Sequence, residues 1–580
     1  MKKLLTGNEA IARGAFEAGV RVAAAYPGTP STEILENIAS YPEIYAEWSP
    51  NEKVALEVGA GASIAGARTL VAMKHVGVNV AADPLLTFAY TGVNGGLVLV
   101  SADDPGMHSS QNEQDNRFYA KFAQIPLLEP SDSQEAKDML IQAYEISEKF
   151  DTPVLFRTTT RVAHSQSLVS LEERKDLPLK DYEKNPQKYV MLPAHGRLRH
   201  PIVEERRVKL SEFSESSSLN RIEQGDQKIG IITSGIVYQY VKEVLPNASI
   251  LKLGITYPLP QKLITTFVQS VEKCYVIEEL EPFLEEQIKA WGLKVIGKEL
   301  FPGIGEFNVE LLAEKFNQVQ GQNQVAASAA ASIPVRPPVL CAGCPHRGVY
   351  YAINKLGLKV AGDIGCYTLG AAPPLSAMDT CICMGASISS ALGMEKARGK
   401  EFARGLVAVI GDSTFIHSGI TGLADVVYNC GTSTILILDN STTAMTGHQE
   451  HPGTGLTIKK EKTKQVNLEA LVRALGVERV QIVDPYNLKA VEQALKDETA
   501  AEEPSVIIFK RPCVLLKGQG PQGLMEVDAT KCKACGRCRK LGCPALVFKG
   551  EQPAVNSALC NGCGQCKQVC NMGAIQEVSR

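Results

Sequence analysis

Eight cysteines in two similar runs end the chain, and they constrain it more than any other feature. Each run repeats Cys-x2-Cys-x2-Cys and then places a fourth cysteine after four or three intervening residues: Cys532, Cys535, Cys538 and Cys543, then Cys560, Cys563, Cys566 and Cys570. Three thiolates at this spacing fit one tight loop around three iron atoms. Zinc sites use Cys-x2-Cys pairs without the third repeat, and disulfides need an oxidising compartment. The runs therefore predict two [4Fe–4S] clusters and transfer of single electrons.

The doubled run resembles the two-cluster domain of ferredoxins. In such domains the fourth ligand of each cluster comes from the other run. The resemblance implies one cluster on Cys532, Cys535, Cys538 and Cys570, and a second on Cys543, Cys560, Cys563 and Cys566. Two features depart from the usual pattern, because four residues precede Cys543 and Asn571 stands where proline often follows the last ligand. Neither departure removes a ligand.

The bulk composition excludes several classes of protein. With 44% hydrophobic and 21% charged residues the chain has an ordinary globular balance, and 580 residues suggest several domains. A net charge of −3 argues against a nucleic-acid binder. No apolar run reaches the roughly 18 residues of a membrane span, and no signal peptide precedes the first domain. We expect a cytoplasmic protein without a membrane or nucleic-acid partner.

Alternating apolar runs and helical stretches predict an α/β protein with several domains. Apolar, β-rich runs at 70–78, 96–104, 228–235, 405–411 and 433–441 are typical of buried parallel strands with helices on both faces of the sheet. The predicted divisions are α/β units at 1–170, 228–318 and 339–515, a charged, irregular connection at 171–227, a linker at 319–338, and the ferredoxin-like α+β domain at 525–580.

In the third α/β unit, polar residues follow two consecutive strands. Asp412 comes directly after the first strand and Asn440 after the second, 28 residues later. A strand–helix–strand crossover takes about 30 residues, so both side chains should lie at the carboxyl edge of the sheet, where such folds bind ligands. With the Thr442 carbonyl they supply hard oxygen ligands for Mg²⁺, and Gly411 would let a phosphate approach. The alternative is a simple turn.

This Gly-Asp-Ser…Asn pattern resembles the signature of thiamine-diphosphate enzymes, with Ser413 in place of its second glycine. The resemblance implies a thiamine diphosphate and Mg²⁺ site at Gly411, Asp412, Ser413, Asn440 and Thr442.

Two segments of the first unit resemble 2-oxoacid:ferredoxin oxidoreductases. NEKVALEVGAGASIAGAR (51–68) resembles their pyrimidine-domain helix and places Glu52 at the catalytic glutamate, with Glu57 as the alternative; a helix start also favours acids without any function. YPGTPST (26–32) resembles their substrate loop and implies that Thr29 lies near the substrate carboxylate. His108 and Gln111 are further candidates for substrate contact, and His346 and His448 for lining the site.

The resemblance extends over the whole chain. GNEAIARGAFEAG, ADDPGMHSSQNEQD, RPPVLCAGCPHRG, DIGCYTLG and the tail are similar to large subunits of the indolepyruvate ferredoxin oxidoreductase family, and 228–318 resembles the transketolase C-terminal-like domain of such enzymes. This implies oxidative decarboxylation of arylpyruvates to aryl-acetyl-CoA, with electrons passed to ferredoxin. It also implies a smaller β subunit, in a heterotetramer with two copies of each chain.

A third [4Fe–4S] cluster is implied by the same resemblance. Its ligands would be Cys341, Cys344, Cys366 and Cys513. Buried core packing is the alternative for Cys366 and Cys513, and it is the expectation for Cys381, Cys383 and Cys430.

Two other functions remain to be weighed. A non-oxidative thiamine decarboxylase would need no electron path, and the cysteine-rich tail argues against it. A non-catalytic electron-transfer subunit would need no diphosphate site, and Glu52, Asp412 and Asn440 argue against that.

Overall fold

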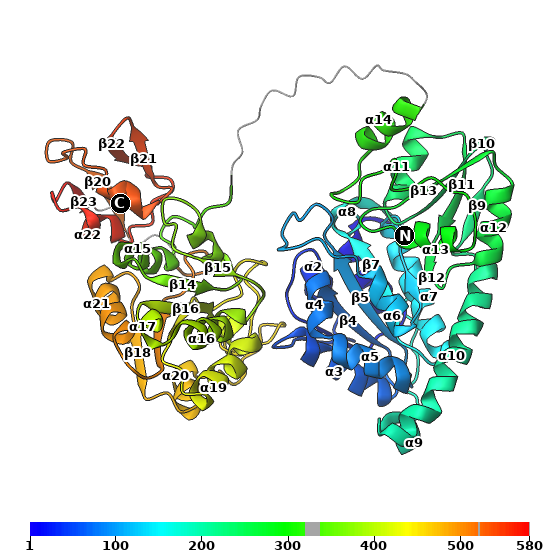
Figure 1. Cartoon of the computed structure of the whole chain (residues 1–580), viewed down its shortest axis with the longest axis horizontal. Coiled ribbons are helices and arrows are strands. Elements are labelled where there is room, and N and C mark those ends of the chain that lie inside the picture. Colours follow the sequence, from blue (N-terminus) through cyan, green and yellow to red (C-terminus); the bar gives the residue numbers. More distant parts are fainter. Residues whose placement is uncertain (320–336, 520–522, 579–580) are drawn as a thin grey trace. The chain divides into compact units, whose positions relative to one another are not determined.

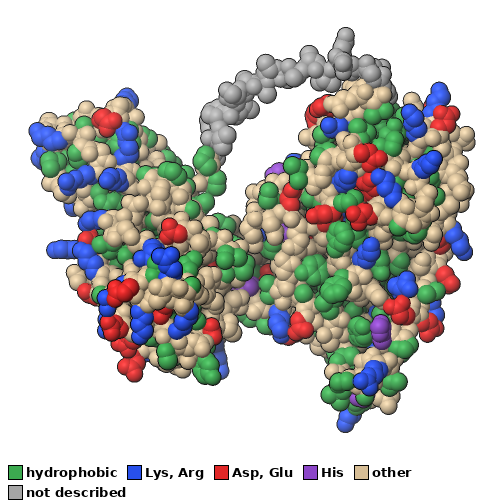
Figure 2. Space-filling model, viewed as in Figure 1, with side chains coloured by type: hydrophobic (Ala, Val, Ile, Leu, Met, Phe, Trp, Pro, Cys, Tyr) green, Lys and Arg blue, Asp and Glu red, His purple; other side chains and the backbone are tan. Residues whose placement is uncertain are grey.

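The computed structural model describes residues 1–319, 337–519 and 523–578 and divides the chain into two compact units (Figure 1). Unit 1 is Met1–Ala331 and unit 2 is Ser332–Arg580. The linker predicted at 319–338 lies outside the described residues except for positions 319, 337 and 338. In the part of the chain that is described, no helix is long and apolar enough to cross a membrane. Lys and Arg are interspersed with Asp and Glu on the faces that Figure 2 presents.

The main sheet of unit 1 has seven strands in the order β12-β6-β7-β5-β4-β2-β3, and all pairs except β12–β6 are parallel. The strands are β2 (Val22–Ala25), β3 (Tyr45–Trp48), β4 (Thr69–Lys74), β5 (Leu97–Asp103), β6 (Leu127–Leu128), β7 (Val154–Thr159) and β12 (Ile255–Tyr257). Every residue of β4, β5 and β7 is buried, as expected for strands covered on both faces. The strand predicted at 70–78 is shorter than expected, because a helix begins at His75.

Helices and a small antiparallel pair complete this part of unit 1. The helices are α1 (Gly7–Glu17), α2 (Thr32–Ile38), α3 (Glu52–Ile64), α4 (His75–Val80), α5 (Ala82–Thr91), α6 (Arg117–Ala123), α7 (Ser133–Phe150) and α8 (Thr160–His164); the pair is β1 (Lys2–Thr6) with β8 (Gln166–Ser170). Helices α3 and α5 share an apolar cluster with β4 and β5, in which Leu56 and Phe88 lie with Val71 and Leu99. This packing fixes the start of α3 beside the sheet edge.

A second sheet follows, in the order β13-β10-β11-β9. Its elements are β9 (Arg221–Glu223), β10 (Asp226–Ser234), α11 (Val237–Val244), β11 (Ala248–Leu253), α12 (Gln261–Gln269), β13 (Lys273–Ile277), α13 (Phe283–Ala290) and α14 (Val309–Val319). The strand expected at 228–235 is therefore present. Strand β12, from the same stretch of chain, pairs with β6 of the main sheet, so residues 228–318 also complete the first sheet.

The connection predicted to be irregular holds a short helix, α9 (Pro186–Tyr189), and a 24-residue helix, α10 (Pro193–Ser216). The buried face of α10 carries arginines, which read as surface residues in the sequence. Arg199 donates to the carbonyls of Tyr90 and Thr91, and Arg206 to that of Ala89. These carbonyls lie at the end of α5, where they have no partner within their own helix. The expectation of an irregular segment was wrong because tertiary hydrogen bonds stabilise this helix.

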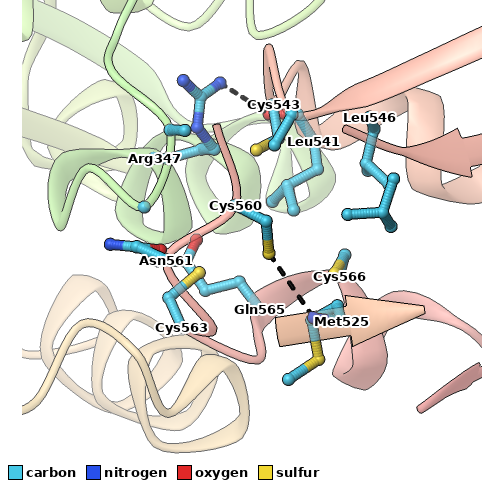
Figure 3. Close-up of a pocket in the computed structure, with 14 residues that line it drawn as sticks. Arg347, Met525, Leu541, Cys543, Leu546, Cys560, Asn561, Cys563, Gln565 and Cys566 are labelled. Carbon is cyan, nitrogen blue, oxygen red and sulfur yellow. Dashed lines mark hydrogen bonds between the residues drawn. The ribbon is translucent and has the colours of Figure 1, made fainter. Parts of the chain in front are cut away.

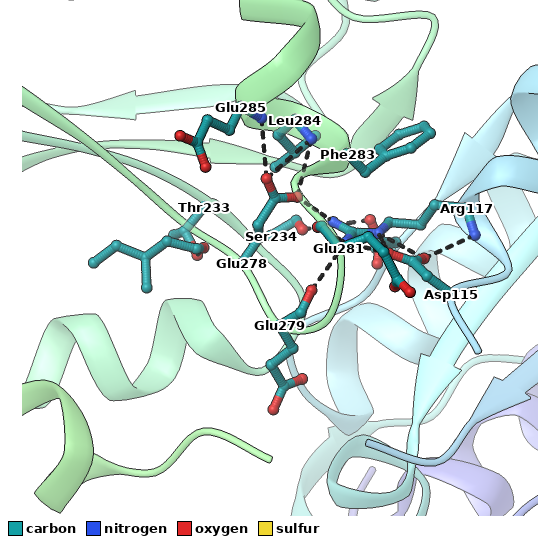
Figure 4. Close-up of polar contacts among 12 residues, drawn as sticks. Asp115, Arg117, Thr233, Ser234, Glu278, Glu279, Glu281, Phe283, Leu284 and Glu285 are labelled. Atoms are coloured by element: carbon teal, nitrogen blue, oxygen red, sulfur yellow. Dashed lines mark hydrogen bonds and ion pairs between the residues drawn. The ribbon is translucent and has the colours of Figure 1, made fainter. Parts of the chain in front are cut away.

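A buried ionic network joins the two sheets of unit 1 (Figure 4). The Arg117 guanidinium contacts Asp115 at 2.5 Å and Glu278 at 2.6 Å, and it donates to the carbonyls of Glu279 and Glu281. Glu278 in turn accepts the backbone N–H groups of Leu284 and Glu285 at the start of α13. Because every charged group in this network has a partner, the junction can stay buried without a large electrostatic cost.

Unit 2 contains a six-stranded parallel sheet in the order β15-β14-β16-β17-β19-β18. Its strands are β14 (Lys359–Gly362), β15 (Thr380–Cys381), β16 (Leu406–Gly411), β17 (Thr434–Asp439), β18 (Arg479–Val483) and β19 (Ser505–Lys510). Its helices are α15 (His346–Leu356), the 3₁₀ helix η1 (Cys366–Ala371), α16 (Ala386–Arg398), α17 (Lys400–Ala403), α18 (Asp412–Thr414), the π turn η2 (Phe415–Gly419), α19 (Ile420–Tyr428), α20 (Leu468–Ala474) and α21 (Leu488–Thr499).

The cysteine-rich tail folds against this sheet domain. It consists of β20 (Leu524–Val527), η3 (Arg537–Leu541), β21 (Leu546–Lys549), β22 (Gln552–Val555), α22 (Gln565–Val569) and β23 (Ile575–Val578), with β20 paired to β23 and β21 to β22, both antiparallel. Its core includes Leu541, Val569 and Ile575, and it extends to Leu488 of α21. The tail is thus two short antiparallel strand pairs and two short helical turns around its cysteines.

Candidate functional site

In unit 2, Asp412 and Asn440 lie at the carboxyl ends of adjacent parallel strands, as the spacing predicted. Gly411 of β16 is in register with Leu438 of β17. The side chain of Asp412 accepts the backbone N–H of Ser441 at 2.9 Å, which links the two loops directly. Both side chains are buried, with 3% of Asp412 and 7% of Asn440 exposed. Two oxygen-bearing side chains therefore meet at one sheet edge, out of contact with most solvent.

Polar groups surround this pair. The backbone N–H of Thr442 donates to Oδ1 of Asn440 at 3.3 Å, and Nδ2 of Asn440 lies 3.4 Å from Nε2 of His346. Nε2 of the buried His451 lies 3.3 Å from a carboxylate oxygen of Asp412. Burial lowers the pKa of His346 to about 4, so this imidazole is neutral at pH 7. His448, the other predicted histidine, instead lies beside Cys513, with Nε2 3.7 Å from Sγ.

The structure gives Gly411 a reason in addition to the one predicted. A Cβ atom at this position would lie 2.6 Å from the ring of Tyr367, which is closer than any real contact. The Tyr367 hydroxyl is held by the carbonyl of Ile364 and by Thr414. Packing against this aromatic ring therefore requires a glycine, and the approach of a phosphate to Gly411 stays a prediction.

The donor set at this edge fits a divalent cation. Asp412 is a buried carboxylate, and no Lys or Arg of the described residues lies within ion-pair distance of it. A buried carboxylate without such a partner is costly unless a cation offsets its charge. Around Asp412, the described residues include no group of three His, Cys, Asp or Glu side chains placed to hold a metal ion. The oxygens for a complete shell would thus come from Asn440, backbone carbonyls and the ligand itself.

In unit 1, the Thr29 loop and Glu52 both contact the segment that ends β4 and begins α4, at the carboxyl edge of the main sheet. Thr29 follows β2 and precedes a cis Pro30. A Cβ atom on the neighbouring Gly28 would lie 3.0 Å from Cβ of Lys74, the last residue of β4. A Cβ atom on Gly77, one turn further along in α4, would lie 2.8 Å from a carboxylate oxygen of Glu52. Lys74 and α4 therefore connect the Thr29 loop to Glu52.

Of the two candidate glutamates, Glu52 is the buried one. It is the first residue of α3 and is 7% exposed, and Asn51 caps the helix by accepting the backbone N–H of Val54. Glu57 lies on the exposed face of the same helix and pairs with Lys53. A carboxylate that acts on a bound ring must be shielded from water, so the geometry favours Glu52.

The two predicted substrate residues of the 104–116 loop differ in their surroundings. Nε2 of His108 lies 3.2 Å from a carboxylate oxygen of Glu306, which also pairs with Arg161. Gln111 is exposed. The loop is attached to the sheet edge through other residues: Lys74 donates to the carbonyl of Ser109, and Nε2 of His75 lies 3.2 Å from the side chain of Asn112.

In the tail, each predicted ligand set lines its own hollow. The first hollow is drawn in Figure 3. Four cysteines line it, one from the first run and three from the second: Cys543, Cys560, Cys563 and Cys566. Sγ of Cys560 accepts the backbone N–H of Met525 at 3.5 Å. Burial, and then the three neighbouring thiols, raise the pKa of Cys566 to about 12.

The second hollow is lined by the complementary set, Cys532, Cys535, Cys538 and Cys570. Burial and the thiols of Cys570, Cys532 and Cys535 raise the pKa of Cys538. All sixteen cysteines of the chain lie in described residues, and none of them forms a disulfide. The fold thus groups the tail cysteines in the crossed arrangement that the resemblance implied.

The four cysteines proposed for a third cluster also come together, from three separate parts of unit 2. Burial and the thiols of Cys341 and Cys366 raise the pKa of Cys344 to about 12. Burial and the thiols of Cys513 and Cys341 raise that of Cys366 to about 11. Cys513 also lies within electrostatic reach of Asp412. Grouped thiols with raised pKa values become favourable ligands once a metal ion compensates for their mutual repulsion.

Three residues near these sites were missed by the sequence reasoning. Arg347 lies between the Cys341 loop and the first hollow, donating to the carbonyls of Cys341, Leu541 and Gly542 (Figure 3). His451 approaches Asp412, and Lys74 packs against the Thr29 loop at Gly28. Only Lys74 carried a signal, as a lone lysine at the end of an apolar strand.

Comparison with known proteins agrees with this geometry. Residues 13–222 match the family model "Pyruvate flavodoxin/ferredoxin oxidoreductase, thiamine diP-bdg", and residues 363–509 match "Thiamine pyrophosphate enzyme, C-terminal TPP binding domain". Indolepyruvate oxidoreductase subunit IorA of Archaeoglobus fulgidus is 43% identical over 99% of this chain and 97% of its own length. The chain belongs to the IorA family. It is accordingly a subunit of a 2-oxoacid:ferredoxin oxidoreductase.

Other IorA subunits match over nearly the whole length of this chain. That of Pyrococcus horikoshii is 43% identical over 100% of this chain and 97% of its own, and that of Methanothermobacter thermautotrophicus is 42% identical over 99% and 97%. A solved 2-oxoglutarate:ferredoxin oxidoreductase from Magnetococcus marinus, with 2-oxoglutarate, coenzyme A and succinyl-CoA bound, covers 56% of this chain and 65% of its own at 19% identity and a TM-score of 0.46. The two family models cover Thr29 and Glu52 in unit 1 and Asp412 and Asn440 in unit 2.

Proposed function

We propose that this chain is the large subunit of an indolepyruvate:ferredoxin oxidoreductase, working in the cytoplasm. In that reaction an arylpyruvate and CoA give an aryl-acetyl-CoA, carbon dioxide, one proton and two electrons. The observation that carries the proposal is that one chain of the IorA family holds both a buried oxygen-ligand edge and two hollows with four cysteines each. A decarboxylase without electron transfer has no use for the hollows, and an electron carrier has no use for the edge.

The residues of unit 2 would bind the diphosphate end of the cofactor. Asp412, the side chain of Asn440 and the carbonyl of Thr442 would hold Mg²⁺, and Ser413 would lie beside the diphosphate. The buried position of Asp412 supports this role, because a carboxylate there gains most from a bound cation. When bound, thiamine diphosphate supplies the electron sink that lets the carboxylate leave as carbon dioxide.

The residues of unit 1 would act on the aminopyrimidine ring and the substrate. Glu52 would hydrogen-bond the ring and hold the proton that the ring exchanges, a role supported by its burial at the start of α3. Thr29 would lie near the 2-oxo acid, together with His108 and Gln111 on the 104–116 loop. Because His108 is already paired with Glu306, it would orient substrate as a hydrogen-bond partner of that carboxylate.

Electrons would leave one at a time through three [4Fe–4S] clusters. The set nearest Asp412 is Cys341, Cys344, Cys366 and Cys513, and the two tail sets follow. Arg347 donates to the carbonyls of both Cys341 and Gly542, which supports a short distance between the cluster of the first set and the cluster of the Cys543 set. Ferredoxin would accept the electrons, and a smaller β subunit would complete a heterotetramer with two copies of each chain.

Dye reduction tests the proposed reaction as a whole. The anaerobic complex of both subunits should reduce a viologen dye only when an arylpyruvate, thiamine diphosphate and CoA are all present. Omitting each component in turn is the matched control. Aldehyde formation without an electron acceptor would favour a non-oxidative decarboxylase, and absence of activity with every 2-oxo acid would favour a non-catalytic electron-transfer subunit.

Iron counts on paired variants test the cluster assignment. With three clusters, the wild type should bind about twelve irons. Cys532→Ser/Cys570→Ser should lose a single cluster and keep about eight irons, because both ligands line one hollow. Cys560→Ser/Cys570→Ser should lose both tail clusters and keep about four. Ligand sets confined to one run each would reverse these two results.

The third set is tested in the same measurement. Cys513→Ala should reduce the count from about twelve to about eight irons, with loss of one cluster signal in the electron paramagnetic resonance spectrum. Cys430→Ala is the control, because this exposed cysteine belongs to none of the three sets. About eight irons in both the wild type and Cys513→Ala would leave only the tail clusters.

A further inference from the structure

Lys74 is a buried cation without an acidic partner. It is the last residue of β4, and 9% of it is exposed. Its ammonium group has three N–H donors, of which one donates to the carbonyl of Ser109 at 2.5 Å. Among the described residues, no carboxylate lies within 4.0 Å of its nitrogen, although other buried lysines of unit 1 have such a partner, as Lys137 has in Glu17. Asp104 acts on this ammonium group only from beyond ion-pair distance. A buried ammonium group without a direct counter-charge is costly, so its position favours a bound anion.

The groups around Lys74 leave it charged and available. Burial lowers the pKa of Lys74 to about 8, and the negative charge of Asp104 opposes this shift. The ammonium form therefore still predominates at pH 7. Asp104 itself is engaged by the N–H of Ser109 and the hydroxyls of Ser110 and Thr160. The adjacent His75 is fully buried, with its Nδ1 atom among the buried polar atoms that lack a hydrogen bond.

The place of Lys74 in the sheet indicates what the anion is. In unit 1, β2 and β4 are neighbours, and the chain leaves β2 toward β3 on its other side. Ligands of open α/β sheets bind at such a reversal, outside the carboxyl ends of the strands. The Thr29 loop follows β2, Lys74 ends β4, and Glu52 contacts Gly77 of the helix that Lys74 precedes. An anion at Lys74 would therefore lie beside the Thr29 loop, at the same sheet edge as Glu52.

We propose that Lys74 binds the carboxylate of the 2-oxo acid substrate. The inference rests on the proposed function, because it takes the substrate from there. An ammonium–carboxylate pair in this buried setting gives a charge-assisted hydrogen bond, which is stronger than the bond to a neutral carbonyl. The pair forms with the intact substrate, and its carboxylate disappears when carbon dioxide leaves. Lys74 should therefore contribute to substrate affinity more than to the rate of the chemical step.

The decisive measurement compares a charged and a neutral ligand on two forms of the enzyme. 3-Phenyllactate and 3-phenyllactamide have a hydroxyl in place of the 2-oxo group and differ only in the carboxylate. Their binding to the anaerobic complex is measured by calorimetry and, separately, by inhibition of dye reduction. The wild type should prefer the acid by about 30-fold or more, and Lys74→Met should reduce this ratio to near one. For an arylpyruvate, KM should rise by a similar factor while kcat changes by only a few-fold.

Two further variants separate charge from loop anchoring. Lys74→Gln keeps a donor for the carbonyl of Ser109 but has no charge, so it should also lose the preference for the acid. Lys74→Arg keeps the charge and should retain a substantial part of it. A folded Lys74→Met or Lys74→Gln enzyme that still prefers the acid by the wild-type factor would overturn the inference. Absence of arylpyruvate oxidation by the wild type would contradict the proposed function, and the calorimetric ratio would still decide the role of Lys74.

Discussion

Glu52→Gln is expected to bind thiamine diphosphate as the wild type does and to lose roughly 10²- to 10⁴-fold in turnover. Glutamine has the shape of glutamate and can keep the packing against Gly77 at the start of α3. It cannot take up or release a proton at neutral pH, so the exchange with the aminopyrimidine ring would be lost. The measurement pairs steady-state dye reduction with cofactor titration of the anaerobic complex.

Glu57→Gln is the matched control for this experiment. It makes the same chemical change five residues later on the same helix, at an exposed position paired with Lys53. We expect its turnover to stay within about two-fold of the wild type, since a surface ion pair contributes little. Full turnover in Glu52→Gln, or a large loss in Glu57→Gln, would move the catalytic role away from Glu52.

Asp412→Asn is expected to weaken binding of thiamine diphosphate and Mg²⁺ by at least about 100-fold, since even groups outside the ligand shell cost 10- to 100-fold in metal affinity. Asparagine preserves an acceptor for the N–H of Ser441, so the two loops should stay linked. What is lost is the negative charge that offsets the cation. Cofactor titration at fixed Mg²⁺, followed by titration of Mg²⁺ itself, measures the effect.

The control for Asp412→Asn lies at the same edge of the same sheet. Asp484 follows β18 and pairs with Arg511 at an exposed position. Asp484→Asn should leave cofactor affinity unchanged. Equal cofactor affinity in wild type and Asp412→Asn, with unchanged melting temperature, would show that another residue provides the charge at this edge.

Two features could not be predicted from the local sequence pattern. The connection that holds α10 was expected to be irregular because it is rich in charged residues, and nothing in the local pattern shows that Arg199 and Arg206 end on the carbonyls of α5. Gly411 was predicted to let a phosphate approach, and the structure adds the ring of Tyr367, 44 residues earlier in the chain, as a group that requires a glycine there. In both cases the contact comes from a distant segment of the chain, and local sequence periodicity does not predict it.

Local sequence patterns were enough to predict the types of ligand and most of the elements of this chain. Ligand spacing is a local property, so the two cysteine runs predicted iron–sulfur clusters, and the 28 residues between Asp412 and Asn440 predicted neighbouring strand ends. For groups that are distant along the chain, the sequence offered only a resemblance, and the fold supplied the contacts. The fold places Cys543 with the second run and Cys570 with the first, brings Cys341, Cys366 and Cys513 together, and packs Lys74 against the Thr29 loop. Contacts between distant residues depend on strand order and core packing, and both are properties of the whole chain.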